Sequence, residues 1–133
     1  MQIGIDMMGG DFAPGSTIGG AILAKESLPG NVNVALIGDQ EIIERYAEEH
    51  QLDLSGISIV HTKDTVGMDD HPLKAFKEKP NAGLFLGQKM LMNGSLDGFC
   101  SAGNTGAMMV GAMQIITSIP ASFVLPLLHQ FPI

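Results

Sequence analysis

The sequence predicts an α/β protein with a mostly parallel sheet covered by helices, and three observations lead to this prediction. Apolar runs that suit short strands alternate with stretches whose apolar residues recur at helical spacing, as in strand–helix–strand units. Glycine-containing turns follow several of these runs, where a strand would lead into a helix. The chain has 133 residues, 45% of them hydrophobic, which is enough for one globular domain with a core.

Four apolar runs are predicted to be strands, and they span residues 2–6, 32–37, 57–60 and 97–101. Pro14 suits the first turn of a helix, where a missing N–H loses no partner. Asp39 directly follows the second strand and is placed to cap the next helix. Three more helices are expected: a short one before Pro80, one over residues 82–92, and a long one that runs to about Thr117.

Composition and charge exclude several classes of protein. The formal net charge is −7 and the seven basic residues are scattered, whereas nucleic-acid binding needs a basic face. A single cysteine allows no internal disulfide and fits a reducing cytoplasm. The first residues do not resemble a signal peptide, and no apolar run approaches the ~20 residues that span a bilayer. We therefore expect a soluble cytoplasmic protein without a transmembrane segment.

The stretch from Asp97 to Ala107 is the strongest candidate for a functional site. It is predicted to be a strand, a glycine-rich turn and the start of a helix. Gly103 and Gly106 let the backbone approach a ligand closely, and Ser101, Asn104 and Thr105 add hydroxyl and amide groups. The free N–H groups of a helix N-terminus favour an anion such as phosphate. An ordinary turn in which Asn104 or Ser101 caps the helix explains the same residues equally well.

Other polar residues are expected along the same edge of the sheet, because ligands bind beyond the carboxyl ends of parallel strands. Asp6 ends the first strand, and Asp11 follows the pair Gly9 and Gly10. Asp11 could orient a substrate, or either acid could cap the helix after Pro14. His61 ends the third strand and could be an acid or base, although a hydrogen-bonded structural histidine is the commoner case.

The remaining candidates are weaker. Lys77 and Lys79 could hold an anionic group, whereas a solvated basic face is the ordinary explanation. Cys100 adjoins the turn, but we expect it to be a buried, apolar strand residue and not a nucleophile. The other histidines have no metal-ligand spacing, so no metal site is predicted.

Two segments resemble signatures of a known family. Ile5-Asp6-Met7-Met8-Gly9-Gly10-Asp11-Phe12-Ala13-Pro14 is similar to the opening of the bacterial phosphate acyltransferases of phospholipid synthesis, the PlsX family. Ser101-Ala102-Gly103-Asn104-Thr105-Gly106-Ala107 resembles their second signature. Shorter similar segments lie between these two, and the resemblance covers about residues 1–126.

The resemblance implies transfer of a fatty acyl group from acyl carrier protein to inorganic phosphate, which gives acyl phosphate. It also implies a three-layer α/β/α fold akin to isopropylmalate dehydrogenases and phosphotransacetylases, a homodimer, and no metal or organic cofactor. Ser101, Asn104 and Thr105 would then be catalytic. Substrate-binding residues would be Gly9, Gly10, Asp11, Gly103, Gly106, His61, Lys77 and Lys79.

Two alternatives stay open: a phosphotransacetylase-like enzyme that uses acyl-coenzyme A, and a non-enzymatic remnant that only binds phosphate or a partner. Members of the family are much longer, with a cleft between this region and a second half. We therefore expect residues 1–126 to be the incomplete N-terminal α/β portion of an acyltransferase. Residues 127–133 are expected to be a divergent tail produced by truncation or a shifted reading frame.

Overall fold

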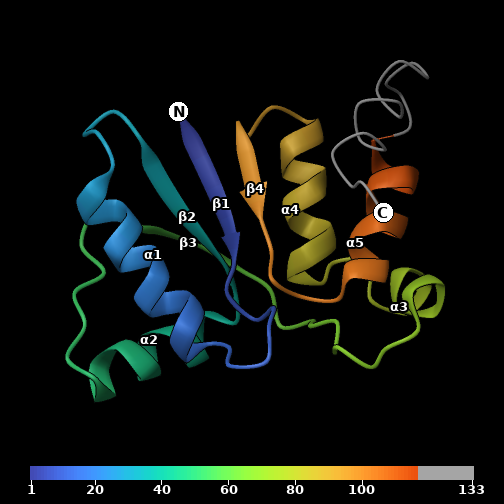
Figure 1. Ribbon diagram of the computed structural model, residues 1–133, viewed down its shortest axis with the longest axis horizontal. Helices are drawn as coiled ribbons and strands as arrows, with labels where there is room; N and C mark the ends of the chain where they lie inside the picture. Colours follow the sequence, from blue (N-terminus) through green and yellow to red (C-terminus); the bar gives the residue numbers. More distant parts are fainter. Residues whose placement is uncertain (117–133) are drawn as a thin grey trace, which may run out of the picture.

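The structure of the protein is a computed structural model, and it describes residues 1–116 (Figure 1). The strands are β1 (Gln2–Asp6), β2 (Asn33–Gly38), β3 (Ser58–His61) and β4 (Gly98–Cys100). The helices are α1 (Gly15–Ser27), α2 (Gln40–Glu49), α3 (Pro72–Glu78), α4 (Gly83–Met92) and α5 (Thr105–Ile115). The predicted strands and helices are therefore found where the apolar patterns placed them. The tail expected at residues 127–133 lies outside the described residues.

The four strands form one sheet in the order β3-β2-β1-β4, and each pairs with its neighbours in parallel. Strand β1 lies inside the sheet, where Ile5 pairs with Leu36 of β2 on one side and with Cys100 of β4 on the other. Because all strands point the same way, their carboxyl ends meet at one edge, as the sequence predicted.

Helices cover both faces of the sheet, as Figure 1 shows. On one face, Ile18 and Ala21 of α1 and Ile43 of α2 pack against Val34 and Leu36 of β2. On the other face, Leu86, Met90 and Leu91 of α4 pack against a second set: Ala35, Ile37, Val60, Leu96 and Phe99. Helix α5 then packs on α4 and on α3. This arrangement confirms the predicted three-layer α/β/α fold.

The predicted cap of α2 is confirmed, whereas the caps suggested for α1 are wrong. Asp39 accepts hydrogen bonds from the backbone N–H groups of Glu41 and Ile42. Helix α1 begins after Pro14 and has no side-chain cap, so neither Asp6 nor Asp11 caps it. Asp6 is unsuited to that role because its carboxyl group is buried against the turn that follows β4.

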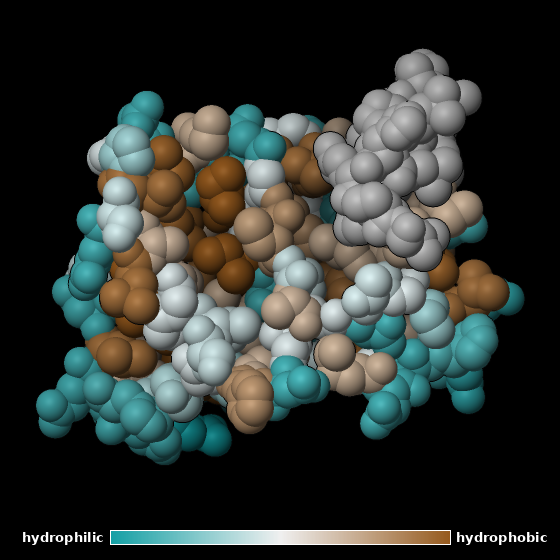
Figure 2. Space-filling view, viewed as in Figure 1, coloured by the Kyte–Doolittle hydropathy of each residue, from teal (hydrophilic) through white to brown (hydrophobic). Residues whose placement is uncertain are grey.

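Cys100 is exposed, so the expectation of a buried cysteine was wrong. Within residues 1–116, β4 pairs only with β1 and is an edge strand. Figure 2 shows apolar residues reaching the surface around α1 and the neighbouring strands in this view. Leu23 of α1 is 66% exposed, and Ile3 and Ile5 of β1 are half-buried. No helix within the described part of the chain is long and apolar enough to cross a membrane.

Candidate functional site at the carboxyl edge of the sheet

The two glycine-containing segments that the sequence singled out lie against each other. They follow β1 and β4, which are neighbours in the sheet. A Cβ atom on Gly9 would lie 3.0 Å from the backbone nitrogen of Gly103 and 3.0 Å from Ser101 Oγ, so only glycine allows this approach. Gly10 has a positive φ of 111° and lies beside Ala102. The loop after β1 and the turn after β4 therefore form one continuous surface.

Asp6, the last residue of β1, connects these two segments through its side chain. Its side chain is buried, and its Oδ2 accepts a hydrogen bond of 2.9 Å from the Ser101 hydroxyl. The same Ser101 oxygen accepts the N–H of Gly103 at 3.1 Å. Burial raises the pKa of the Asp6 carboxyl, and hydrogen bonds from Ser101, Met8 and Gly9 partly offset that effect. The sequence marked Asp6 only as an acid at a strand end, and its link to Ser101 depends on a contact 95 residues along the chain.

Asn104 caps α5 and also fastens a distant loop. Its Oδ1 accepts the N–H of Ala107, which satisfies one free donor of the first helical turn. Its Nδ2 donates to the backbone carbonyls of Gly67, Met68 and Asp70 at 3.1, 3.3 and 2.9 Å. Both ends of this buried side chain thus have protein partners.

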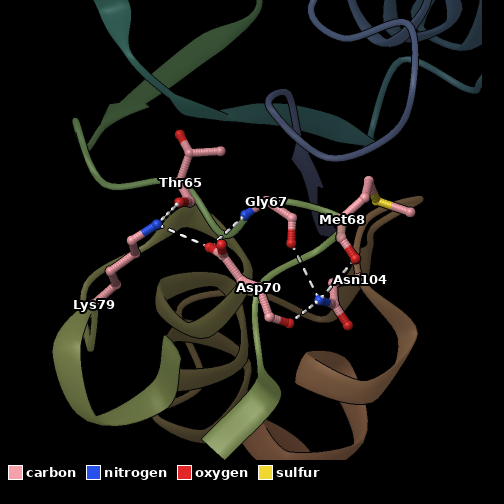
Figure 3. Close-up of polar contacts among 6 residues, drawn as sticks. All are labelled: Thr65, Gly67, Met68, Asp70, Lys79 and Asn104. Atoms are coloured by element: carbon pink, nitrogen blue, oxygen red, sulfur yellow. Dashed lines mark hydrogen bonds and ion pairs between the residues drawn. The ribbon is translucent and has the colours of Figure 1, made fainter. Parts of the chain in front are cut away.

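The loop held by Asn104 is fastened from its other side by Lys79, as Figure 3 shows. The Lys79 ammonium donates to the Thr65 carbonyl and to Asp70 Oδ2, each at 2.9 Å. Asp70 Oδ2 also accepts the N–H of Gly67 at 2.8 Å. The hydrogen bond from Lys79, followed by that from Gly67, lowers the pKa of Asp70. The Lys79 ammonium therefore binds the loop of residues 65–70, which runs past the start of α5.

The first turn of α5 offers hydrogen-bond donors that have no protein acceptor. Among residues 1–116, no acceptor meets the N–H groups of Thr105 and Gly106 or the hydroxyl of Thr105, whose side chain is exposed. Pro72, at the start of α3, closes one side of this turn, since a Cβ on Gly106 would lie 2.6 Å from Pro72 Cγ. Positive helix-end potential and free donors at a solvent-facing turn suit an anion.

Three of the predicted site residues, His61, Lys77 and Asp11, belong to other elements than this turn. His61 ends β3, and its Nδ1 accepts the N–H of Gln40 at 3.0 Å. β3 is three strand spacings from β4, which corresponds to about 14 Å. Lys77 is exposed on α3, and Asp11 is exposed on the loop after Gly10. The structure thus groups Gly9, Gly10 and residues 101–106, and separates them from His61.

A hollow lies beside α3. It has a volume of about 280 Å³ and is lined by Asp69, Asp70, His71, Lys74, Ala75, Glu78 and Lys79. Its charges are mixed, and the Asp70–Lys79 ion pair forms part of its wall. Within residues 1–116, no cluster of three or more His, Cys, Asp or Glu residues has a geometry that could hold a metal ion.

Comparison with known proteins then decides the family. Residues 1–123 match the family model described as fatty acid synthesis protein. The chain belongs to this family. It is 40% identical to a phosphate acyltransferase of Dictyoglomus turgidum, over 99% of this chain and 40% of the relative. It is 41% identical to the phosphate acyltransferase of Caldicellulosiruptor saccharolyticus, over 90% of this chain and 35% of the relative.

A phosphate acyltransferase of Enterococcus faecalis is 35% identical over 90% of this chain and 34% of its own length. The chain therefore spans at most about 40% of the length of these curated relatives. Their shared name is that of the family which the two signatures resemble, so the predicted family membership is confirmed.

Proposed function

We propose that this chain provides the phosphate-binding side of an active site that transfers a fatty acyl group from acyl carrier protein to inorganic phosphate. The observation that supports this most strongly is the match to proteins named phosphate acyltransferase, which covers nearly the whole chain. The free donors at the start of α5, beside the Gly9 and Gly10 loop, give that match a physical basis. Both signatures of the family contribute to this one surface.

In the proposed reaction, an oxygen of hydrogen phosphate attacks the carbonyl carbon of the acyl thioester. A carbon–oxygen bond forms, the carbon–sulfur bond breaks, and the proton of hydrogen phosphate ends on the departing thiolate. The products are acyl phosphate and the free thiol of the carrier. No electron transfer is involved, and the balance needs no further reactant.

The residues have different roles in this proposal. Thr105 binds phosphate through its hydroxyl and N–H, and Gly106 adds a second N–H. Ser101, Gly103 and Asn104 hold the turn in the shape that presents these donors, because their own hydrogen-bonding groups have protein partners. Gly9 and Gly10 let phosphate reach the turn, and Asp11 orients the substrate from the adjoining loop. His61, Lys77 and Lys79 contribute at most to the periphery, where the lysines could meet an acidic carrier protein.

Phosphate binding by the purified chain tests the first part of the proposal. Thr105→Val removes the hydroxyl while keeping the shape of the side chain, and Thr105→Ser is the matched control that keeps the hydroxyl. We expect Thr105→Val to weaken phosphate binding about tenfold, as for loss of one hydrogen bond to a charged group. Thr105→Ser should bind nearly as the wild type does. A wild-type chain that binds no phosphate in titration calorimetry would contradict the proposal.

The acyl donor needs a separate assay, since a phosphotransacetylase-like enzyme would use acyl-coenzyme A. A polypeptide that carries this chain within the full length of its relatives should form acyl phosphate from acyl carrier protein thioesters in preference to coenzyme A thioesters. Preference for coenzyme A would support the alternative enzyme, and phosphate binding without turnover on either donor would support a binding remnant. A homodimer and a cytoplasmic location stay predictions from the resemblance and from the single cysteine.

A further inference from the structure

Asp6 is a buried carboxyl group that the reaction described above does not use. It lies at the end of β1, inside the sheet, with 4% of its surface exposed. Met8 donates its N–H to Asp6 Oδ1 at 3.2 Å. A Cβ on Gly9 would lie 2.5 Å from Oδ2, and one on Gly83 would lie 3.1 Å from Oδ1, so glycines surround the group closely. The carboxyl group therefore has little room to turn away from Ser101.

The Ser101 hydroxyl makes two hydrogen bonds, one as donor and one as acceptor. A serine hydroxyl has one hydrogen, and the Asp6 carboxyl group accepts it at 2.9 Å. The Ser101 oxygen is then free to accept, and Gly103 donates its N–H to it at 3.1 Å. Asp6 thus sets the direction of both hydrogen bonds. Gly103 in turn precedes Asn104 and Thr105, where α5 and its free donors begin.

We propose that Asp6 is a positioning residue, which fixes the turn of residues 101–104 through the Ser101 hydroxyl and so presets the phosphate-binding donors at the start of α5. This inference rests on the proposed function. Asp6 itself does not contact phosphate in this account. Its effect reaches the ligand through Ser101, Gly103 and the first turn of α5.

Stability alone does not explain a carboxyl group at this position. Burying a carboxylate is unfavourable, and burial is the largest influence on the Asp6 pKa, which it raises. A neutral side chain of the same shape would avoid that penalty. An asparagine at residue 6 could still accept the Met8 N–H through its Oδ1. Its Nδ2 would then donate to Ser101 Oγ, which reverses the direction of that hydrogen bond and leaves the Ser101 hydrogen without its acceptor.

The decisive experiment uses Asp6→Asn, Ser101→Ala and the double variant in the full 133-residue chain. The probe is inorganic phosphate, and its dissociation constant is measured by titration calorimetry at pH 7 to 8. Loss of a negative charge near an anion site would by itself tighten phosphate binding. Loss of positioning would instead weaken it, so the two effects have opposite signs. We expect Asp6→Asn to weaken binding about tenfold. This is the effect of losing one hydrogen bond from a misplaced donor of the first turn of α5 to the charged phosphate.

Two further measurements distinguish positioning from a merely structural role. Amide hydrogen exchange at Gly103 should be faster in Asp6→Asn, because the Ser101 oxygen must then also accept from the residue-6 amide and its hydroxyl hydrogen has lost its acceptor, whereas the melting temperature should not fall. The double variant should bind phosphate no more weakly than the weaker single variant, because both changes break one linkage. Asp64→Asn is the matched control: it removes an exposed carboxylate at the same edge of the sheet and should leave Gly103 exchange and phosphate binding unchanged.

Phosphate binding as tight as, or tighter than, that of the wild type in Asp6→Asn would overturn the inference. So would weaker binding with unchanged Gly103 exchange, since Asp6 would then act by another route. If the wild-type chain binds no phosphate, the proposed function loses its acceptor site, and the Gly103 exchange rate alone decides the inference. Faster exchange in Asp6→Asn, with an unchanged melting temperature, would still show that Asp6 sets the turn.

Discussion

The side chain of Asn104 performs two tasks that the sequence could not separate. One end caps α5 through the N–H of Ala107, and the other end holds the loop of residues 67–70. A cap of this kind is a local feature, which the pattern of residues around the turn can suggest. The loop contact spans 34 to 37 residues and arises only when the chain folds.

Replacement of Asn104 by alanine should therefore destabilise the chain by about 2–3 kcal/mol, the sum of a lost cap and lost hydrogen bonds. Asn104→Ser is the control, because serine can cap the helix but is too short to reach the loop. We expect its free energy of unfolding in urea to fall between those of the wild type and the alanine variant. Alanine and wild-type chains of equal stability would contradict the structure.

In a full-length acyltransferase, Asn104→Ala would also test whether Asn104 positions the phosphate-binding donors in addition to stabilising the fold. We predict that the turnover number falls by a larger factor than the loss of folded protein explains, because the donors at the start of α5 lose their fixed positions. Unchanged turnover with a lower melting temperature would assign Asn104 to the cap and the loop alone.

Asp6 gives a prediction about pH dependence. Its pKa in the folded chain is raised above the 3.8 of the free group, so the folded state holds this proton more tightly than the unfolded state does. The contribution of Asp6 to stability is therefore fully present below pH 3.8 and is lost as the pH rises through the folded-state pKa. Asp6→Asn should gain stability relative to the wild type across that rise, as measured by thermal unfolding from pH 3 to pH 8. A stability difference that does not change with pH would show that the carboxyl group is not penalised by burial.

At the scale of the elements, glycines decide how closely the helices pack. A Cβ on Gly87 of α4 would overlap the ring of Phe99 on β4. A Cβ on Gly111 of α5 would overlap the side-chain oxygen of Gln88, a buried residue of α4. The side-chain amide of Gln88 also donates an N–H from Nε2 to the Met108 carbonyl at 2.9 Å. Helix α4 thus lies tightly between the sheet and α5, and this packing places the start of α5 beside the loop after β1.

Gly87→Ala should destabilise the chain by about 1–3 kcal/mol, because an added methyl group must displace the Phe99 ring. Gly19→Ala is the matched control on α1, where a Cβ would meet no atom within 4 Å. That substitution should stabilise the chain by about 0.5–1 kcal/mol, since alanine favours a helix over glycine. Thermal unfolding measures both, and equal effects at the two positions would contradict the packing.

At the scale of the whole molecule, the donors that we propose bind phosphate lie at the carboxyl edge of the sheet. Thr105 is exposed there, and the apolar side chains of Phe12 and Met68 are 79% and 46% exposed on the neighbouring loops. The curated relatives are much longer than this chain, which spans 40% of the first of them. A thioester must be held against phosphate and kept from water, and such positioning can supply about 7–11 kcal/mol of a barrier.

We therefore expect the isolated 133-residue chain to bind phosphate without forming acyl phosphate. The assay supplies acyl carrier protein loaded with an acyl group, together with phosphate, and the phosphate acyltransferase of Dictyoglomus turgidum is the positive control. Production of acyl phosphate by a folded, monodisperse sample at the rate of the control would show that the chain is sufficient by itself.

Much of the fold was determined by the sequence alone. Short apolar runs indicate the strands, apolar residues at helical spacing indicate the helices, and Asp39 caps α2 through atoms only two and three residues away. The parallel direction of the strands follows because each is separated from the next by a helix. The meeting of the two glycine-containing signatures at one edge could also be expected, since both follow strands of the same sheet.

The tertiary structure alone decided which polar groups are left for a ligand. The sequence left open whether Ser101, Asn104 and Lys79 bind a ligand or have structural roles. Each has a protein partner, whereas within residues 1–116 no acceptor meets the donors of Thr105 and Gly106. Strand order, which no local pattern records, placed Asp6 beside Ser101 and left Cys100 on an exposed edge. The physical reason is the range of the interactions: propensity and capping act over a few residues, whereas satisfaction of a buried polar group depends on segments that only folding brings together.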